Sequence, residues 1–184
     1  MRELSLNILD IAQNSISAGA SLIEIEVSED TVKKTLLIGI YDDGCGMTQE
    51  QVKNVLDPFY TTRTTRKVGM GVPLFKLAAE QTGGGLKIES EKGKGTRVQA
   101  LFKTDSIDFT PLGDVASTLV VLITMNTDRD FIYTRSRNGE SFVLSTAEMK
   151  EILGEVPLNE PEVAQWMKDY INEQTNILLG GVNK

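Results

Sequence analysis

Two carboxylates and two glycines stand close together in the stretch DDGCGM, residues 42–47, which follows an apolar run. A carboxylate at the end of a strand can accept a hydrogen bond from a ligand, and glycines let a backbone approach a ligand without a Cβ. Taken alone, the stretch is more simply a turn that ends a strand. Its interpretation therefore depends on the other motifs of the chain.

Three further motifs contain residue types that bind nucleotides or phosphates. Asp10 and Asn14 lie four residues apart, so on a helix their side chains would share one face. Gly69 and Gly71 stand where a helix would begin, and the free N–H groups at a helix N-terminus favour a phosphate. The stretch GKGT, residues 93–96, is most simply a hairpin turn. Each motif is weak alone, because a solvated helix face or a chance pair of glycines would also explain it.

The elements that must position these motifs follow from hydrophobic periodicity and turn signals. The 3.6-residue period of residues 2–18 predicts an amphipathic helix that stops at Gly19. Alternation over residues 22–27 predicts a half-buried strand, and the more apolar residues 35–41 predict a central strand. The other elements expected are a helix at 49–56 capped by Thr48, a basic loop at 57–68, a helix at 69–81, and a hairpin of strands 85–90 and 96–102.

Beyond about residue 105 the chain has no motif of this kind. Residues 112–125 are ambiguous, and we favour a helix over a strand. Asn138-Gly139 predicts a hairpin with a type I′ turn. The N-caps expected in this region are Asp114, Ser145 (in a capping box with Glu148) and Asn159. The apolar residues of the last helix, Trp166, Met167 and Tyr170 among them, are expected in the core.

Composition excludes several classes of function. The net charge of −7 argues against broad binding to nucleic acid or to an anionic membrane. The chain has no histidine, which excludes a histidine base, metal ligand or phosphate acceptor. Its single cysteine, Cys45, cannot form an internal disulfide and is expected to be a small packing residue. No apolar run reaches the ~18–20 residues of a membrane span, and the N-terminus does not resemble a secretory signal, so we expect a cytoplasmic protein.

In this order and spacing, the four motifs resemble the boxes of the GHKL, or Bergerat-fold, ATPase superfamily. That group includes gyrase B-type topoisomerases, mismatch-repair ATPases, heat-shock chaperone ATPases and histidine-kinase catalytic domains. DIAQNSISAGA resembles the N box, most closely in its mismatch-repair form, and DDGCGM resembles the G1 box. DPFYTTR and VGMGVPLFK are similar to the F and G2 boxes of histidine kinases of the nitrogen-regulatory type, and GKGT is similar to the last glycine box.

The resemblance extends over residues 1–104 and implies a fold for them. It implies an α/β (α+β) two-layer sandwich, with helices on one face of a mixed, mostly antiparallel sheet. Residues 105–184 are expected to form a C-terminal α+β extension. That extension is either a partner-binding or dimerisation unit or a set of elements that simply enlarges the core.

The resemblance also implies the cofactors, ATP and Mg²⁺, and the residues that bind them. Asp42 would accept a hydrogen bond from the adenine amino group, where guanine has a carbonyl, and Thr96 would join it through water. Asn14 would ligate Mg²⁺. The loop 60–71 would close over the triphosphate, with Arg63 and either Arg66 or Lys67 as charge partners. The nucleotide-binding residues implied are Asn14, Asp42, Gly44, Gly46, Met47, Phe59, Thr62, Arg63, Gly69, Met70, Gly71, Val72 and Thr96.

Three positions depart from the family pattern. Lys67 replaces the usual first glycine of the G2 box, and Asp43 stands where asparagine is frequent. Asp10 matters most, because hydrolysing relatives carry a glutamate there as the base and histidine kinases usually carry a non-acidic residue. Aspartate is shorter by one methylene, roughly 1.5 Å. A misplacement of about 1 Å can cost ~100-fold in rate, so we expect slow hydrolysis at best.

The expected function is that of an ATP- and Mg²⁺-binding regulatory protein that phosphorylates or signals to a separate partner protein. The absence of histidine and the nine residues before Asp10 place the phosphate acceptor on another chain, as in anti-sigma-type regulators that phosphorylate a partner serine. The alternatives are a slow autonomous ATPase with Asp10 as base, and a nucleotide-sensing switch without catalysis. A mismatch-repair ATPase is disfavoured, because it would need a longer lid and a larger following domain. The oligomeric state is left open.

Overall fold

The computed structural model of the chain describes residues 3–58 and 71–180. Within these ranges the helices are α1 (Leu4–Ser17), α2 (Gln49–Val55), α3 (Gly71–Gln81), α4 (Val115–Thr124), α5 (Thr146–Leu153) and α6 (Pro161–Leu178). The strands are β1 (Leu22–Asp30), β2 (Thr35–Asp42), β3 (Gly85–Glu91), β4 (Gly95–Lys103), β5 (Asp130–Arg137) and β6 (Glu140–Ser145). No helix of the described part is long and apolar enough to cross a bilayer.

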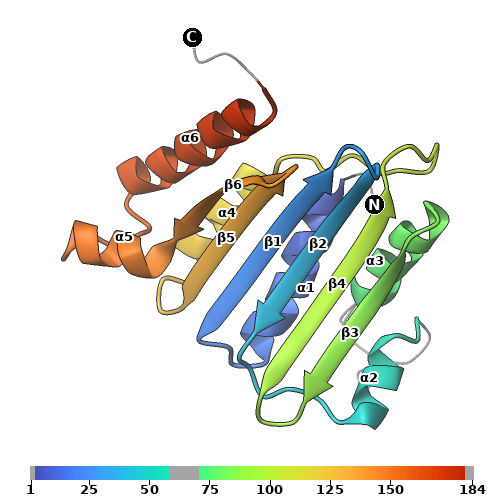
Figure 1. Ribbon diagram of the computed structural model, residues 1–184. Helices are drawn as coiled ribbons and strands as arrows, with labels where there is room; N and C mark the ends of the chain where they lie inside the picture. Colours follow the sequence, from blue (N-terminus) through green and yellow to red (C-terminus); the bar gives the residue numbers. More distant parts are fainter. Residues whose placement is uncertain (1–2, 59–70, 181–184) are drawn as a thin grey trace.

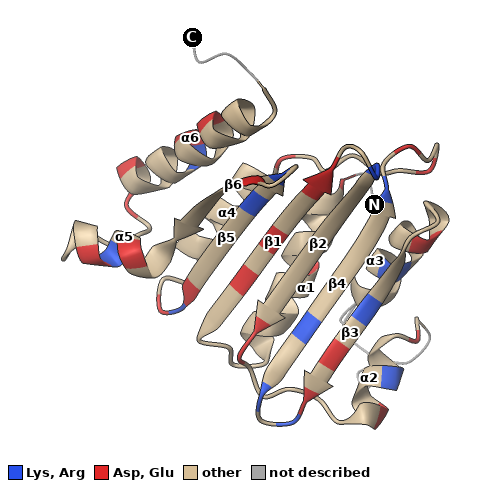
Figure 2. Cartoon of the chain, viewed as in Figure 1, with Lys and Arg blue, Asp and Glu red and all other residues tan. Residues whose placement is uncertain are grey.

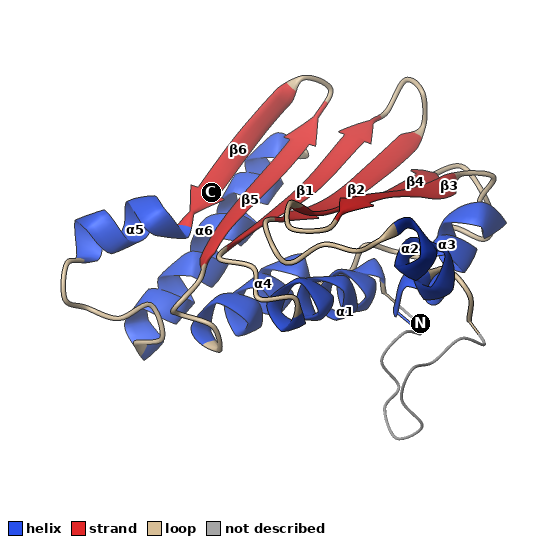
Figure 3. Ribbon diagram, turned by 90° about the horizontal axis from the view of Figure 1, so that it is seen from below, coloured by secondary structure: helices blue, strands red, loops and turns tan. Residues whose placement is uncertain are grey.

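One mixed sheet joins the strands in the order β3-β4-β2-β1-β5-β6 (Figure 1). Neighbouring strands are antiparallel except β1 and β5, which are parallel. Helices α1, α3, α4 and α6 lie on one face of the sheet (Figure 3). The predicted two-layer sandwich with a mostly antiparallel sheet is therefore confirmed.

Alternating side chains explain why the helices gather on one face. In β2 the fully buried Ile38 and Ile40 point toward the helices, as Ile23 and Ile25 do in β1. Helix α1 meets them with Leu4, Ile8 and Ile11, the stripe that its periodicity predicts. Full burial of each such side chain contributes roughly 1.5–3 kcal/mol. This packing fixes the rotation of α1, and with it the positions of Asp10 and Asn14.

Residues after 104 continue the same sheet and core. Helix α4 forms despite its β-branched residues, with Asp114 accepting a hydrogen bond from the Ser117 N–H at 3.0 Å, and it packs against α1 and α6. Strand β5 then pairs with β1, and the buried residues of both halves form one hydrophobic cluster. The type I′ turn is confirmed by the positive φ angles of Asn138 and Gly139. The division of the chain at residue 104 stays a prediction.

The end of α1 and the N-cap of α2 follow the prediction. The chain leaves α1 at Ala18, and Gly19 follows with φ +76°. Thr48 caps α2 and forms a full capping box with Gln51.

Three expectations for the C-terminal region are wrong or incomplete. The N-cap of α6 is Glu160, not Asn159, because Pro161 takes the first helical position, where its fixed φ and missing N–H fit. Ser145 accepts a hydrogen bond from the Glu148 N–H, but no return bond from the Glu148 side chain completes the capping box. Met167 is fully buried, whereas Trp166 is 51% exposed, because it lies at the flank of the buried stripe of α6.

Candidate functional site

The carboxylate of Asp42 connects helix α1 to the end of strand β2. Ser15 Oγ donates a hydrogen bond to Asp42 Oδ2 at 2.6 Å. The Gly44 N–H donates to Oδ1 at 2.9 Å. Ser15 is itself buried on the inner side of α1. Helix α1, which carries Asp10 and Asn14, is thus in direct contact with the stretch 42–47. Both oxygens of the Asp42 carboxylate are fixed in place.

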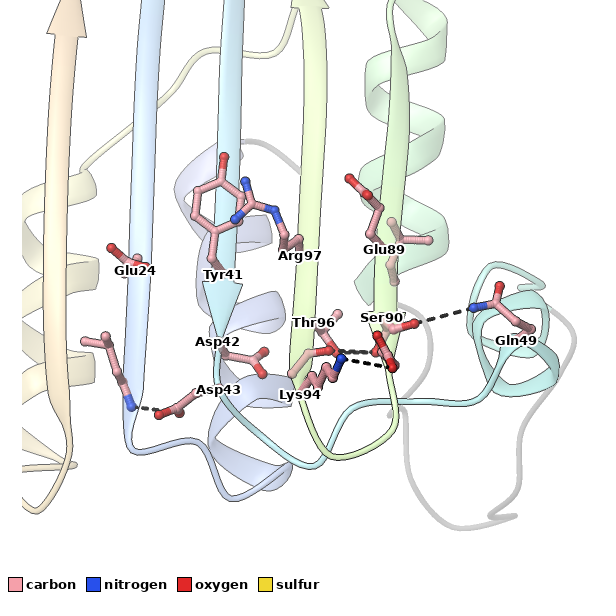
Figure 4. A pocket seen from close by; sticks show the side chains of 14 residues that line it. Glu24, Tyr41, Asp42, Asp43, Gln49, Glu89, Ser90, Lys94, Thr96 and Arg97 are labelled. Atoms are coloured by element: carbon pink, nitrogen blue, oxygen red, sulfur yellow. Dashed lines mark hydrogen bonds and ion pairs between the residues drawn. The ribbon is translucent and has the colours of Figure 1, made fainter.

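The β3–β4 hairpin brings a group of hydroxyls beside this carboxylate (Figure 4). Thr96 stands opposite Asp42 in the β2–β4 register. Its Oγ1 lies 2.8 Å from Ser90 Oγ, which also accepts a hydrogen bond from the Met47 N–H at 2.8 Å. Asp42 and Met47, from the stretch 42–47, and Thr96, from the distant stretch 93–96, therefore meet at one end of the sheet.

Glycines allow the backbones of these motifs to touch each other. Gly46 has φ +69°, and a Cβ there would overlap the Glu91 carbonyl oxygen. Gly95 has φ +107°, and a Cβ there would overlap the carbonyl oxygen of Asp42. A Cβ at Gly44 would lie 2.9 Å from Ala18 Cβ. We predicted that Gly44 and Gly46 free space for a ligand, and the contacts that require them here are with the protein itself.

Asp10 faces the beginning of α3, and Asn14 lies one helical turn further along α1. A Cβ built at Gly71, the first residue of α3, would lie 3.2 Å from Asp10 Cβ, and Val72 beside it is buried. Neither the Asp10 nor the Asn14 side chain makes a hydrogen bond or ion pair to a described residue. Partial burial raises the pKa of the Asp10 carboxyl above its ordinary value. Among the described residues, the Asp10 and Asn14 side chains thus have no hydrogen-bond or ion-pair partner, and Asp10 lies beside the first residue of α3.

Asp43 points away from this group and has a structural role. Its carboxylate accepts hydrogen bonds from the Ser21 N–H at 2.8 Å, Ser21 Oγ at 2.6 Å and the Leu22 N–H at 3.0 Å. These bonds, led by the one from the Ser21 hydroxyl, lower the pKa of Asp43. The second carboxylate of DDGCGM therefore fixes the start of β1.

The opposite face of the same strands has its own polar cluster. Tyr41 lies over Gly39, where a Cβ would overlap its hydroxyl. The hydroxyl donates to Glu26 Oε1 at 2.9 Å and accepts from Gln99 Nε2 at 2.9 Å. The Arg97 guanidinium stacks 4.1 Å from the centroid of the Tyr41 ring.

A cavity of about 570 Å³ opens at this end of the sheet, and residues of both faces, Asp42 and Tyr41 included, line it (Figure 4).

Sequence reasoning missed two hydroxyls and misjudged one thiol. Ser15 interrupts the apolar stripe of α1, which was a usable signal, and Ser90 follows from pairing the predicted hairpin strands. Cys45 is exposed rather than packed. Its backbone makes the contacts, since its N–H donates to the Ala18 carbonyl at 2.9 Å and its carbonyl accepts from the Gly93 N–H at 2.6 Å.

Part of the expected site lies outside the described residues. These positions are Phe59, Thr62, Arg63, Gly69 and Met70, together with the expected charge partners Arg66 and Lys67.

Comparisons with known proteins agree with the motifs. Residues 1–106 match the family described as Histidine kinase-, DNA gyrase B-, and HSP90-like ATPase. Sporulation kinase C of Bacillus subtilis (strain 168) is 34% identical over 100 residues, which are 53% of this chain and 23% of the kinase. Sensor protein SrrB of Staphylococcus aureus (strain NCTC 8325 / PS 47) is 34% identical over 101 residues, 52% of this chain and 17% of the sensor. The chain thus spans less than a quarter of the length of these curated relatives.

A solved structure extends the likeness of fold into the C-terminal region. The crystal structure of the N terminal domain of a DNA repair protein matches 79% of this chain and 53% of its own, with a TM-score of 0.58. The sequence identity of 17% limits this likeness to the fold.

Proposed function

Because the chain belongs to the family of histidine kinase-, DNA gyrase B- and HSP90-like ATPases, we propose that it binds ATP with Mg²⁺ beside Asp42 and acts on a separate partner protein. The adenine would lie against Asp42 and Thr96, and the phosphates would extend toward Asn14 and the beginning of α3.

The observation that supports this site most strongly is the fixed carboxylate of Asp42. Each of its oxygens accepts one hydrogen bond, from Ser15 or from Gly44, and each oxygen has a further lone pair. An adenine amino group can donate to it, and a hydrogen bond to a charged group contributes ~1.5–3 kcal/mol. Guanine presents a carbonyl at the equivalent position, which the carboxylate repels. The site therefore selects adenine.

The residues near α3 fit a phosphate group with its metal. Asn14 offers a carboxamide oxygen with no protein partner among the described residues, and Mg²⁺ takes such hard oxygen ligands together with phosphates. The N–H groups that begin α3 lie beside Asp10 and favour negative charge. Bound Mg²⁺ would supply charge neutralisation to the phosphates, and Asn14 would hold it on the α1 side.

Whether the chain hydrolyses ATP depends on how far the Asp10 carboxylate extends from α1. A carboxylate here can orient a water molecule, but it is one methylene shorter than the glutamate of hydrolysing relatives. We therefore place phosphoryl transfer or signalling to a partner protein ahead of autonomous hydrolysis. The likeness to a sporulation kinase and a sensor protein supports this order. A slow ATPase with Asp10 as base, and a nucleotide switch without catalysis, are the two alternatives.

Calorimetric titration of ATP with Mg²⁺ tests the site directly. Asp42→Asn replaces one acceptor oxygen by a donor that faces the adenine amino group, so we expect affinity to fall at least ~100-fold. Asp108→Asn, an exposed change without a side-chain hydrogen bond to a described residue, should bind as the wild type does. GTP should fail to compete. Unchanged affinity of Asp42→Asn would remove Asp42 from the site.

Labelled ATP then separates the three reactions. Phosphate released from the γ-position by the purified chain would favour the autonomous ATPase. Label transferred to an added candidate partner would favour the kinase. Tight binding with neither product would favour the switch.

A further inference from the structure

A second surface lies at the β6 edge of the sheet, away from the edge formed by β3 (Figure 1). There α5 and α6 enclose an apolar groove of about 380 Å³. Its lining residues are Met149, Ile152 and Leu153 from α5 and Glu162, Val163 and Trp166 from α6. All but Glu162 are apolar, and all lie outside the residues that match the ATPase family.

The groove has a buried floor and exposed walls. Met149 and Val163 are buried, whereas Ile152 is 85% exposed and Trp166 is 51% exposed. The indole of Trp166 stacks on the Tyr170 ring, with centroids 5.1 Å apart and planes at 13°, so it is held in position. A preformed apolar groove with an anchored tryptophan is typical of a surface that another apolar face covers.

Acidic residues are frequent on α5 and α6, the two helices that form the groove (Figure 2). Residues 145–180 contain seven carboxylates and two lysines. Lys150 Nζ already forms an ion pair with Asp130 Oδ1, at 2.9 Å. Glu162 lines the groove, and Glu148 and Glu151 stand exposed on the helix that presents Ile152. The groove is therefore apolar in its centre and negative around its rim.

We propose that the α5–α6 groove binds a basic amphipathic helix of a partner protein. The apolar face of such a helix would cover Ile152 and Trp166, and its lysines and arginines would meet the acidic rim. A second copy of this chain docked by the same surface would place carboxylates against carboxylates. An anionic membrane would meet the same repulsion. The proposal goes beyond nucleotide binding and does not depend on it.

The test uses two synthetic peptides of about 18 residues, or five helical turns. Both have leucines on one face; the other face is lysine in the first peptide and glutamate in the second. Trp166 is the only tryptophan of the chain, so its emission reports on the groove directly. The leucine–lysine peptide should bind saturably without nucleotide and shift the emission to shorter wavelength. Added salt should weaken binding, and the leucine–glutamate peptide should not bind.

Matched variants distinguish the groove from general attraction to an acidic protein. Ile152→Ser should lower the affinity for the leucine–lysine peptide about tenfold. Ile107→Ser changes a side chain that is 99% exposed and lies outside the groove, so it should leave that affinity unchanged. Both positions are exposed, so neither change threatens folding. Glu162→Gln should lower the affinity for the same peptide and make that affinity less dependent on salt concentration.

Four results would overturn the proposal. The first two are equal binding of both peptides and equal binding by the two serine variants. The third is a dimer, seen by light scattering, that Ile152→Ser dissociates, which would assign the groove to a second copy. The fourth is binding to phosphatidylserine vesicles that Ile152→Ser abolishes, which would assign it to a membrane.

Discussion

The Asp42 site and the α5–α6 groove belong to one sheet and are built in opposite ways. At Asp42, polar atoms have partners within the protein, and glycines let three backbone segments touch. At the groove, large apolar side chains are exposed, the carboxylate of Glu162 lies among them, and Glu148 and Glu151 are exposed on α5. The first arrangement suits a small ligand that must be recognised atom by atom. The second suits a large partner whose contacts are numerous and individually weak.

The difference implies two kinds of response to substitution. In the Asp42 site, one added methyl group or one lost hydroxyl displaces groups that other motifs depend on. In the groove and its neighbouring elements, a similar change alters an exposed position and displaces no other group. Substitutions of the same type, made once in each region, therefore measure the contrast.

The largest difference is expected between two glycines. Gly46→Ala puts a Cβ against the Glu91 carbonyl oxygen at φ +69°, so the 42–47 stretch and the hairpin must separate. We expect a loss of about 3 kcal/mol or more in the free energy of unfolding. Gly154→Ala, at φ +61° and ψ −114° with open space around it, meets backbone strain without a clash and should cost less than Gly46→Ala, about 1–3 kcal/mol. Urea unfolding followed by circular dichroism measures both, and equal losses would refute the close approach at Gly46.

A comparable effect on rate is expected at Asp10. If the short side chain limits hydrolysis, Asp10→Glu should raise ATP turnover by up to ~100-fold, and Asp10→Asn should remove it. The base must be ionised, and burial raises the pKa of Asp10, so wild-type turnover should decline with acid at a pH above the ordinary value of 3.8. Phosphate release across a pH series measures this. Turnover that survives in Asp10→Asn would exclude Asp10 as base.

A smaller change is expected from the hydroxyl of Ser15. Ser15→Ala removes the 2.6 Å hydrogen bond that fixes Asp42 Oδ2, and the carboxylate then loses orientation. ATP affinity should fall about tenfold, which is 1.4 kcal/mol. Ser17→Ala, at an exposed position of the same helix, is the matched control. Equal affinities of the two variants in calorimetry would mean that Gly44 alone holds Asp42.

Local signals made most of the fold predictable from sequence. The apolar stripe of α1, the alternation in β1 and Asn138-Gly139 each specify a conformation through neighbours in the chain, and all three predictions are confirmed. The cap of α6 was misplaced because two local signals compete, and Pro161 prevails. Trp166 was misjudged because periodicity gives the direction of a helix face but not how far the neighbouring elements extend over it.

The site was predictable in its residue types but not in its contacts. Asp42 and Thr96 could be named from motifs, and their roles stay predictions. The bond from Ser15 and the reason for Gly46 depend on which segments meet across the fold. Asp43 shows the same limit, because its partners, Ser21 and Leu22, are twenty or more residues away and nothing in DDGCGM points to them.

The smallest effect is expected at Asp43, and acid should remove it. Asp43→Ala deletes three hydrogen bonds to the start of β1, but the carboxylate is exposed, so we expect a loss of about 1 kcal/mol in the free energy of unfolding at pH 7. Its pKa is lowered in the folded state, so its contribution is complete above 3.8, the ordinary value. The contribution is then lost as the pH falls through the lower folded value. Urea unfolding at pH 7 and at about pH 3 measures this. The difference in the free energy of unfolding between the wild type and Asp43→Ala should become smaller in acid, while Asp108→Ala should stay close to the wild type at both pH values. A gap that persists in acid would mean that the charge of Asp43 has no part in holding β1 in place.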